Sequence, residues 1–172
     1  MALRPAVPGD MATVAEIWHR GWHVSHPGHV PDGLTAGRTL AAFHERTPAR
    51  VADTTVAEVD GRVVGFTMVV GDEVEQVFLD PDLHGSGLAA ELLRHAEQQV
   101  AAAGHDVAWL AVVTGNARAR WFYEKRGWRD AGDLPYEVTA LGERFVSPCR
   151  RYEKRVSTAG TSAPSGPTSP DR

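Results

Sequence analysis

The chain has 172 residues, of which 42% are hydrophobic and 23% charged, and its formal net charge is −4. These values indicate one globular domain, and the lack of a lysine and arginine block argues against nucleic acid as a partner. The single cysteine, Cys149, excludes an internal disulfide and any zinc site built from several cysteines. No apolar run approaches membrane-spanning length and the chain opens without an apolar signal core, so we expect a cytoplasmic protein without membrane contact.

Hydrophobic periodicity and turn residues predict the elements of the first half of the chain. Met11, Val14 and Ile17 recur at helical spacing behind Asp10, which is a candidate N-cap. The Asp-Gly pair at 60–61, between two runs rich in β-branched residues, indicates a hairpin with a tight turn. The predicted order is a short strand starting at residue 3, a helix over 9–22, a loop over 26–33, a second helix over 34–46 and the hairpin over 54–70.

The second half alternates strands and helices. It contains predicted strands over 73–79, 107–113, 136–141 and 144–154, and predicted helices over 87–104 and 116–128. The resulting order, β-α-α-β-β-β-α-β-α-β-β, predicts an α/β fold with a mixed sheet, because the hairpins add antiparallel strands. We expect one domain over residues 1–155. Residues 156–172 are rich in Ser, Thr, Pro, Ala and Gly, which indicates a disordered tail.

Three histidines, His23, His26 and His29, lie at even spacing and suggest a metal site. However, Pro27 and Gly28 follow His26 and break any helix, so no helix face presents all three side chains. No carboxylate lies between them. We therefore expect these histidines to lie in a loop or near a substrate, and we expect no metal cofactor.

A glycine-rich turn, HGSGLAA at residues 84–90, precedes the predicted helix over 87–104. Its G-x-G-x-x-A pattern imitates a dinucleotide-binding fingerprint, but five residues separate it from the preceding strand, and Asp106 precedes the next strand instead of ending it. The chain lacks the Gly-Lys-Ser/Thr of a Walker phosphate loop and the G-x-S-x-G of a nucleophile elbow. Two alternatives remain: a loop that only starts a helix, and a nest of backbone N–H groups for another phosphate.

Two motifs together resemble the GCN5-related N-acetyltransferase (GNAT) family. In the family's phosphate loop, Gln/Arg-x-x-Gly-x-Gly/Ala, the defined positions correspond to His84, Gly87 and Ala89. The later motif Asn-x-x-Ala-x-x-Phe/Leu-Tyr-x-x-x-Gly-Phe is similar to NARARWFYEKRGW at residues 116–128, with Trp128 as the final aromatic residue. The order of the predicted elements matches as well. His84 departs from the family's Gln or Arg, so the loop lacks the fixed charge of an arginine.

The resemblance implies a GNAT-like fold with a central, twisted, largely antiparallel sheet of about seven strands, flanked by about four helices. It also implies acetyl-CoA as co-substrate, with the pantetheine arm between the strands at 75–79 and 109–113 and paired with backbone groups of Val77 and Leu79. The implied coenzyme A site comprises Val77, Phe78, Leu79, His84, Gly85, Ser86, Gly87, Leu88, Ala89, Asn116 and Tyr123.

The resemblance also implies two catalytic residues. Tyr123 stands at the position of the family's acid and is expected to protonate the leaving thiolate, because a phenol is only a slightly weaker acid than a thiol. Its alternative is a packing role. Glu75 resembles the family's strand glutamate, which often accepts the amine proton through water; its alternative is a solvated strand edge. An oxyanion contact is expected from a backbone N–H near Val77. Glu73 lies two residues before Glu75, so both face one side unless a bulge intervenes.

The amine acceptor is expected to bind at the first two helices and the last hairpin, where Trp22, His23, Glu73 and Tyr136 are candidate contacts. We expect an N-acetyltransferase that moves an acetyl group from acetyl-CoA to a primary amine of a small molecule or peptide, as a monomer or homodimer. A non-catalytic module that binds or senses acyl-CoA is the alternative from another class. A dinucleotide-dependent oxidoreductase is the third.

Overall fold

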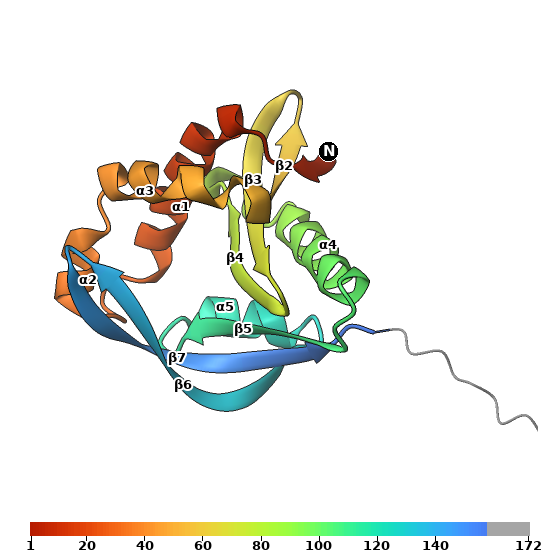
Figure 1. Cartoon of the computed structure of the whole chain (residues 1–172). Coiled ribbons are helices and arrows are strands. Elements are labelled where there is room, and N and C mark those ends of the chain that lie inside the picture. Colours follow the sequence, from red (N-terminus) through yellow and green to blue (C-terminus); the bar gives the residue numbers. More distant parts are fainter. Residues whose placement is uncertain (158–172) are drawn as a thin grey trace, which may run out of the picture.

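Seven strands form one sheet in the computed structural model, which describes residues 1–157 (Figure 1). The predicted tail over 156–172 lies almost entirely outside the described residues. The elements are β1 (Ala2–Pro5), α1 (Met11–Ser25), α2 (Asp32–Gly37), α3 (Leu40–Arg46), β2 (Thr54–Val59), β3 (Arg62–Val70), β4 (Glu73–Leu79), α4 (Leu88–Ala102), β5 (Val107–Val113), α5 (Ala117–Glu124), β6 (Arg129–Ala140) and β7 (Glu143–Arg155), with short 3-10 helices η1 (Pro8–Asp10), η2 (Thr47–Asp53) and η3 (Pro81–Leu83).

The strands lie in the order β1-β2-β3-β4-β5-β7-β6. Neighbouring strands are antiparallel except β4 and β5, which run parallel. This confirms the prediction of a mixed, largely antiparallel sheet of about seven strands. The β4–β5 register pairs only Glu73 with Trp109, and beyond this pair the two strands diverge (Figure 1). The sheet therefore contains a V-shaped opening between β4 and β5, called here the strand fork.

Buried residues form one core cluster on one face of the sheet and two on the other. Helices α1, α2 and α3 cover the first face, where Trp18 is 4% exposed and Phe43 is fully buried. Helix α4 covers the other face and contributes Leu93 to one cluster and Leu92 to the other, and α5 packs against the cluster of Leu93. Figure 1 shows α1 and α3 on one side of β3 and β4 and α4 on the other. We call the face covered by α1, α2 and α3 the α1 face and the opposite one the α4 face. Each large apolar side chain contributes about 1.5–3 kcal/mol when buried, so the helices stabilise the sheet from both sides.

The prediction of one continuous helix over residues 34–46 is wrong, because the structure has two helices there, α2 and α3. Between them, Arg38 has φ of −91° and ψ of 55°, which is not a helical conformation. Thr39 then caps α3, since its Oγ1 accepts a hydrogen bond of 3.2 Å from the N–H of Ala42. The break turns Arg38 inward, where its Nη1 donates to the carbonyl oxygen of Thr139 at 3.1 Å. The described residues thus contain five α-helices in place of about four.

Asp10 immediately precedes α1, as predicted, but its side chain does not cap this helix. Its Oδ2 accepts hydrogen bonds from the N–H of Val7 at 2.9 Å and from Nη1 of Arg4 at 2.7 Å. These donors lie before the helix, and a charged guanidinium is a stronger donor than a backbone amide. Asp10 therefore fixes the connection between β1 and α1 instead of the first turn of α1.

Candidate functional site

The glycine-rich turn forms an open loop between β4 and α4. Gly85 and Gly87 have φ of +85° and +87°, a left-handed conformation that favours glycine. No heavy atom lies within 4 Å of an ideal Cβ at either position, so the loop borders open space. Helix α4 begins at Leu88, and its first N–H groups and the positive end of its dipole therefore lie at the loop. Backbone of this kind binds phosphate oxygens without a lysine.

His84 precedes the glycines, at the end of η3. Burial lowers the pKa of its imidazole, and the positive charge of Arg118 on α5 lowers this pKa further. The ring is therefore neutral at physiological pH and donates one hydrogen bond. Arg118 was missed by the sequence analysis, and it brings to this loop a permanent positive charge that His84 does not supply.

The strand fork leaves one edge of β4 free of backbone pairing. Beyond the single residue pair that joins the strands, residues 76–79 have no partner on β5 within the described part of the chain. The side chain of Phe78 packs on the α1 face and stacks on Phe66, with ring centroids 5.8 Å apart. Leu79 packs against Leu92 on the α4 face. These predicted site residues can therefore offer a ligand their backbone groups, while their side chains support the core.

Tyr123 of α5 lies on the α4 face beside the fork. Its ring contacts those of Phe122, Trp128 and Tyr152, with centroids 5.2, 6.0 and 6.3 Å away. Val77 of β4 packs against the same cluster. Burial alone raises the pKa of the Tyr123 hydroxyl group, and no charged or hydrogen-bonding neighbour among the described residues shifts it. The phenol therefore holds its proton at neutral pH and is not committed to another side chain.

Helix α5 is anchored at its N-terminus and through Arg120 in its middle, which fixes the position of Tyr123. Oδ1 of Asn116 accepts a hydrogen bond of 3.1 Å from the N–H of Ala119, so Asn116 is the predicted N-cap. Arg120 donates to the hydroxyl of Tyr152 at 3.2 Å and to the carbonyl oxygen of Thr114 at 3.3 Å. These bonds tie the helix to β7 and to the end of β5.

On the α1 face, two predicted acceptor contacts touch each other. The hydroxyl group of Tyr136 donates a hydrogen bond of 3.0 Å to Oε1 of Glu73. Burial raises the pKa of the Glu73 carboxyl group above its usual value, and the Tyr136 hydrogen bond offsets this only in part. Burial and the charge of Glu73 also raise the pKa of Tyr136. Glu73 is therefore a better proton acceptor than a solvated carboxylate.

Glu75 lies on the same face as Glu73, although a bulge intervenes. The β3–β4 register pairs Met68 with Gln76 and Val69 with Val74, so Glu75 is the extra residue on β4. Burial is the main cause that raises the pKa of Glu73, and the negative charge of Glu75 adds to it. Glu73 accepts from Tyr136 and Glu75 accepts from Arg50, and both partners belong to elements that pack on the α1 face.

Arg50 of η2 was missed by the sequence analysis. Its Nη2 donates to Oε2 of Glu75, and its Nε donates to Oδ2 of Asp53 at 3.0 Å. Within residues 1–157, Arg50 donates its hydrogen bond to Oε2 of Glu75 and none to Oε1. Arg50 therefore orients the Glu75 carboxylate and leaves one oxygen for another partner. No sequence motif marks this arginine, which lies 25 positions before Glu75.

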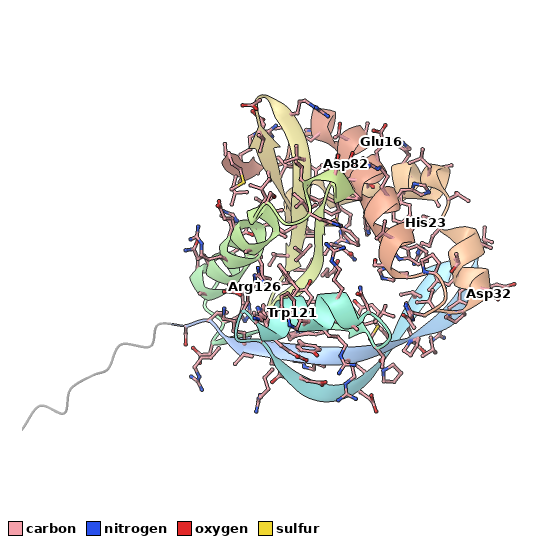
Figure 2. All side chains as sticks on the ribbon, turned by 180° about the vertical axis from the view of Figure 1, so that it is seen from behind. Glu16, His23, Asp32, Asp82, Trp121 and Arg126 are labelled. Carbon is pink, nitrogen blue, oxygen red and sulfur yellow. The ribbon has the colours of Figure 1, made fainter. Side chains whose placement is uncertain are left out.

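The remaining predicted acceptor contacts, Trp22 and His23, lie on α1. Trp22 is 6% exposed and stacks on His26 with centroids 4.6 Å apart, so it belongs to the core and not to an open surface. Nε2 of His23 forms a hydrogen bond of 2.7 Å with the carbonyl oxygen of Arg38. Figure 2 shows His23 on α1 and Trp121 on α5, the helices that supply the two sides of the site.

A groove of about 650 Å³ lies beside this constellation, between the loop after α1 and the β6–β7 hairpin. Its lining is mostly apolar and contains none of the predicted site residues: His29, Val30, Pro31, Thr114, Asp133, Pro135, Val146, Pro148 and Cys149. Within residues 1–157, no group of three His, Cys, Asp or Glu side chains could hold a metal ion, and no helix is long and apolar enough to cross a membrane.

Comparison with known proteins agrees with this geometry. The model of the acetyltransferase (GNAT) family matches residues 13–128. The chain belongs to this family. The matched segment of this GNAT protein includes the glycine loop, the strand fork, Glu73, Glu75 and Tyr123. The match ends at Trp128, before β6 and β7.

Relatives support the same assignment, and solved structures share the fold. An uncharacterized N-acetyltransferase of Mycobacterium tuberculosis is 35% identical over 123 residues, covering 68% of this chain and 78% of the relative. A peptidyl-lysine N-acetyltransferase of Salmonella typhimurium, YjaB, is 29% identical over 90 residues, covering 48% of this chain and 52% of YjaB. The structure of yncA, a putative acetyltransferase from Salmonella typhimurium with its cofactor acetyl-CoA, has a TM-score of 0.65 at 19% identity and covers 99% of this GNAT protein and 98% of that chain.

Proposed function

We propose that this protein transfers an acetyl group from acetyl-CoA to a primary amine of a small molecule or peptide. The observation that carries the proposal is the strand fork, which has a protonated phenol, Tyr123, on the α4 face and two carboxylates, Glu73 and Glu75, on the α1 face. A thioester donor and an amine acceptor can therefore approach the fork from opposite faces of the sheet. Its two sides carry the acid and the base that acyl transfer needs.

The glycine loop and α5 fit the donor. The open backbone at Gly85 and Gly87 and the start of α4 suit a pyrophosphate, and Arg118 adds positive charge. His84 donates a hydrogen bond as a neutral ring. Beyond it, the free edge of β4 at residues 76–79 can pair with the amide groups of a pantetheine arm. Acetyl-CoA supplies an acetyl group activated as a thioester.

The acceptor must lose a proton to become a nucleophile. Glu75, whose Oε1 accepts no hydrogen bond from Arg50 in the described part of the chain, accepts this proton directly or through a water molecule. Glu73 lies close by with a raised pKa, and its charge helps to hold a cationic amine in place. A backbone N–H near Val77 on the free edge of β4 stabilises the negative charge that develops on the acetyl oxygen.

Tyr123 supplies the other proton. Its hydroxyl group protonates the sulfur atom as the thiolate leaves, and solvent then restores the phenol. A buried phenol has a raised pKa, yet the same surroundings also raise the pKa of a thiol, so the transfer stays close to balanced. The side chain thus acts on the α4 face while Glu75 acts on the α1 face.

A panel of amines tests this proposal. The full chain is incubated with acetyl-CoA and amino acids, diamines, aminoglycosides and lysine peptides, and thiol release is measured together with the acetylated product. We expect release that depends on the amine and on Tyr123. Binding of acetyl-CoA without release for any amine, and no effect of Tyr123→Phe, would support the non-catalytic acyl-CoA module instead.

A thermal-shift comparison separates the remaining alternative. We expect coenzyme A and acetyl-CoA to raise the Tm, whereas NAD, NADP and FAD should not. Stabilisation by a dinucleotide alone would favour the oxidoreductase. Fractionation of cells and size-exclusion chromatography test the expected cytoplasmic location and the expected monomer or homodimer.

A further inference from the structure

Three arginines gather on the α1 face next to the two glutamates of the proposed site. Arg38 lies between α2 and α3, Arg46 ends α3, and Arg50 lies in η2. α3 and η2 are consecutive in the chain and pack against each other, which brings Arg46 near Arg50. The charge of Arg50 lowers the pKa of Arg46, and that of Arg46 lowers the pKa of Arg38. We call them the arginine row.

Only one end of the arginine row is neutralised. Arg50 forms ion pairs with Glu75 and Asp53. Within residues 1–157, Arg38 and Arg46 form no ion pair, and no carboxylate appears among the causes of their pKa shifts. Two positive charges of the row are thus left without a counter-ion in the described part of the protein.

The two unpaired arginines are shielded from solvent to different degrees. Arg38 is 6% exposed, and burial lowers its pKa to about 10. Arg46 is partly buried, and its guanidinium carbon lies 5.6 Å from the ring centroid of Trp18 and 5.5 Å from that of Phe43. Burial is also the largest cause that lowers the pKa of Arg46. Buried charges of one sign are costly, and an anion placed between them would remove most of this cost.

The free nitrogens of the row remain accessible. Arg38 donates from Nη1 to the carbonyl oxygen of Thr139, which leaves its other N–H groups without a partner. These nitrogens are not fully buried, so they retain contact with solvent. A guanidinium group with two free N–H groups is suited to a small oxyanion, because it can donate two parallel hydrogen bonds.

One end of the arginine row, Arg50, lies at the carboxylates, and the other end, Arg38, lies away from them. Arg50 bonds Glu75, and Tyr136 on β6 bonds Glu73, while Arg38 bonds Thr139 three residues further along β6. Negative charge therefore lies at the fork, and unpaired positive charge lies further from it, towards α2 and α3. This separation matches a ligand with a cationic amine at one end and an anion at the other.

We propose that the acceptor is an amine that carries a small oxyanion, a carboxylate or phosphonate, which Arg46 and Arg38 bind while the amine lies at Glu73 and Glu75. This inference rests on the proposed function and names the class of acceptor. Binding of the oxyanion would place the amine at the fork, so the arginines are positioning and specificity residues and take no part in proton transfer.

Matched acceptors test the inference on the full chain. Each amino acid of the panel is compared with its methyl ester and with its phosphonate analogue, and kcat/KM is measured for each at a fixed concentration of acetyl-CoA. Wild-type protein should prefer the carboxylate or the phosphonate over the neutral ester by about tenfold or more, as expected for one charged hydrogen-bonded contact. The two anions distinguish which oxyanion is bound.

Two variants locate the preference. Arg46→Met keeps an apolar side chain against Trp18 and should reduce the ratio of acid to ester by about tenfold, mainly through KM, while kcat/KM for the ester stays unchanged. Arg62→Gln removes an exposed arginine of β3 and should leave the ratio unchanged. If Arg46→Met does not fold, Arg46→Lys takes its place, because it keeps the charge and loses the forked geometry.

The outcomes are distinct. If the protein acetylates amines but accepts the ester as well as the acid, or if folded Arg46 variants keep the wild-type ratio, the inference is wrong and the proposed function stands. In that case the arginines serve only to pack on Trp18 and to bond β6. If no amine is acetylated, the proposed function fails and the inference with it.

Discussion

The hydroxyl group of Tyr136 donates a hydrogen bond of 3.0 Å to Oε1 of Glu73, and this bond joins β6 to β4. The two strands are not neighbours, because β5 and β7 lie between them in the sheet. The bond therefore connects parts of the sheet that the fork separates. It also holds a half-buried carboxyl group, whose pKa burial raises above its usual value.

Glu73→Gln should stabilise the protein in a pH-dependent way. Glutamine keeps the shape and can accept the Tyr136 hydrogen bond without a buried charge. Because the folded-state pKa of Glu73 is raised, the stability that its protonation contributes is full below the unfolded pKa of about 4.3 and is lost as pH rises through the folded pKa. Thermal unfolding should show a higher Tm for the variant near pH 8 and no difference near pH 4. Glu143→Gln, at an exposed carboxylate, is the control, and a gain that grows towards acid pH would contradict the argument.

Tyr123→Phe should lower kcat by about a hundredfold, because it removes the proposed acid. Its hydroxyl bonds no described side chain, so the Tm should change little. Tyr152→Phe offers the opposite pattern: its hydroxyl donates to Glu124 at 2.7 Å and accepts from Arg120, so loss of these bonds should cost about 1–3 kcal/mol of unfolding free energy. Steady-state kinetics and chemical unfolding of both variants provide the measurement. Equal kinetic losses would indicate that Tyr123 only packs.

Gly87→Ala should weaken binding of coenzyme A. Its φ of +87° is unfavourable for alanine by about 1–2 kcal/mol, although no neighbouring atom would contact the new methyl group. The loop should relax to another conformation and lose its inward N–H groups, which raises the Kd measured by calorimetry. Gly9→Ala is the matched control, since Gly9 also borders open space but lacks a positive φ. An unchanged Kd in Gly87→Ala would show that the loop does not bind the pyrophosphate.

Asp10→Asn should destabilise the fold at neutral pH. The Arg4 guanidinium, together with the N–H of Val7, holds the pKa of Asp10 below its usual value. The stability from its ionised form is present above the unfolded pKa of about 3.9 and is lost as pH falls through the lower folded pKa. We expect a loss of about 2 kcal/mol near pH 7 that shrinks as pH falls below about 4. Urea unfolding at several pH values measures this loss. A constant difference across this range would argue against an ionic contribution.

Local signals predicted the parts of the fold that depend on local physics. Asn116 caps α5 through its own side chain, and Asp60 and Gly61 both adopt positive φ in the hairpin turn between β2 and β3. The glycine loop was predicted because glycine spacing reflects backbone geometry. The division between α2 and α3 was not predicted, because the break depends on the distant contact of Arg38 with Thr139, 101 positions away.

The residues of the candidate site were predicted on the α4 face, but only some of them were predicted on the α1 face. Tyr123 and Glu75 were predicted from their motif positions. No motif marks the segments that carry Arg50, Arg46 and Arg38. Arg50 meets Glu75 only because η2 packs against α1 and β3. Trp22 was predicted as an acceptor contact because it lies on the first helix, where the acceptor was expected to bind. Its side chain is instead buried in the core and stacks on His26.

The fork has a consequence for the cooperativity of folding. Along the backbone, the half of the sheet from β1 to β4 is joined to the half from β5 to β7 by one residue pair, Glu73 and Trp109. An extended ligand with its own amide groups would act as a surrogate strand and continue the ladder across this break. Amide protons along the free edge of β4 should therefore exchange quickly without ligand, and the two halves should lose their protection together only when the surrogate strand is bound.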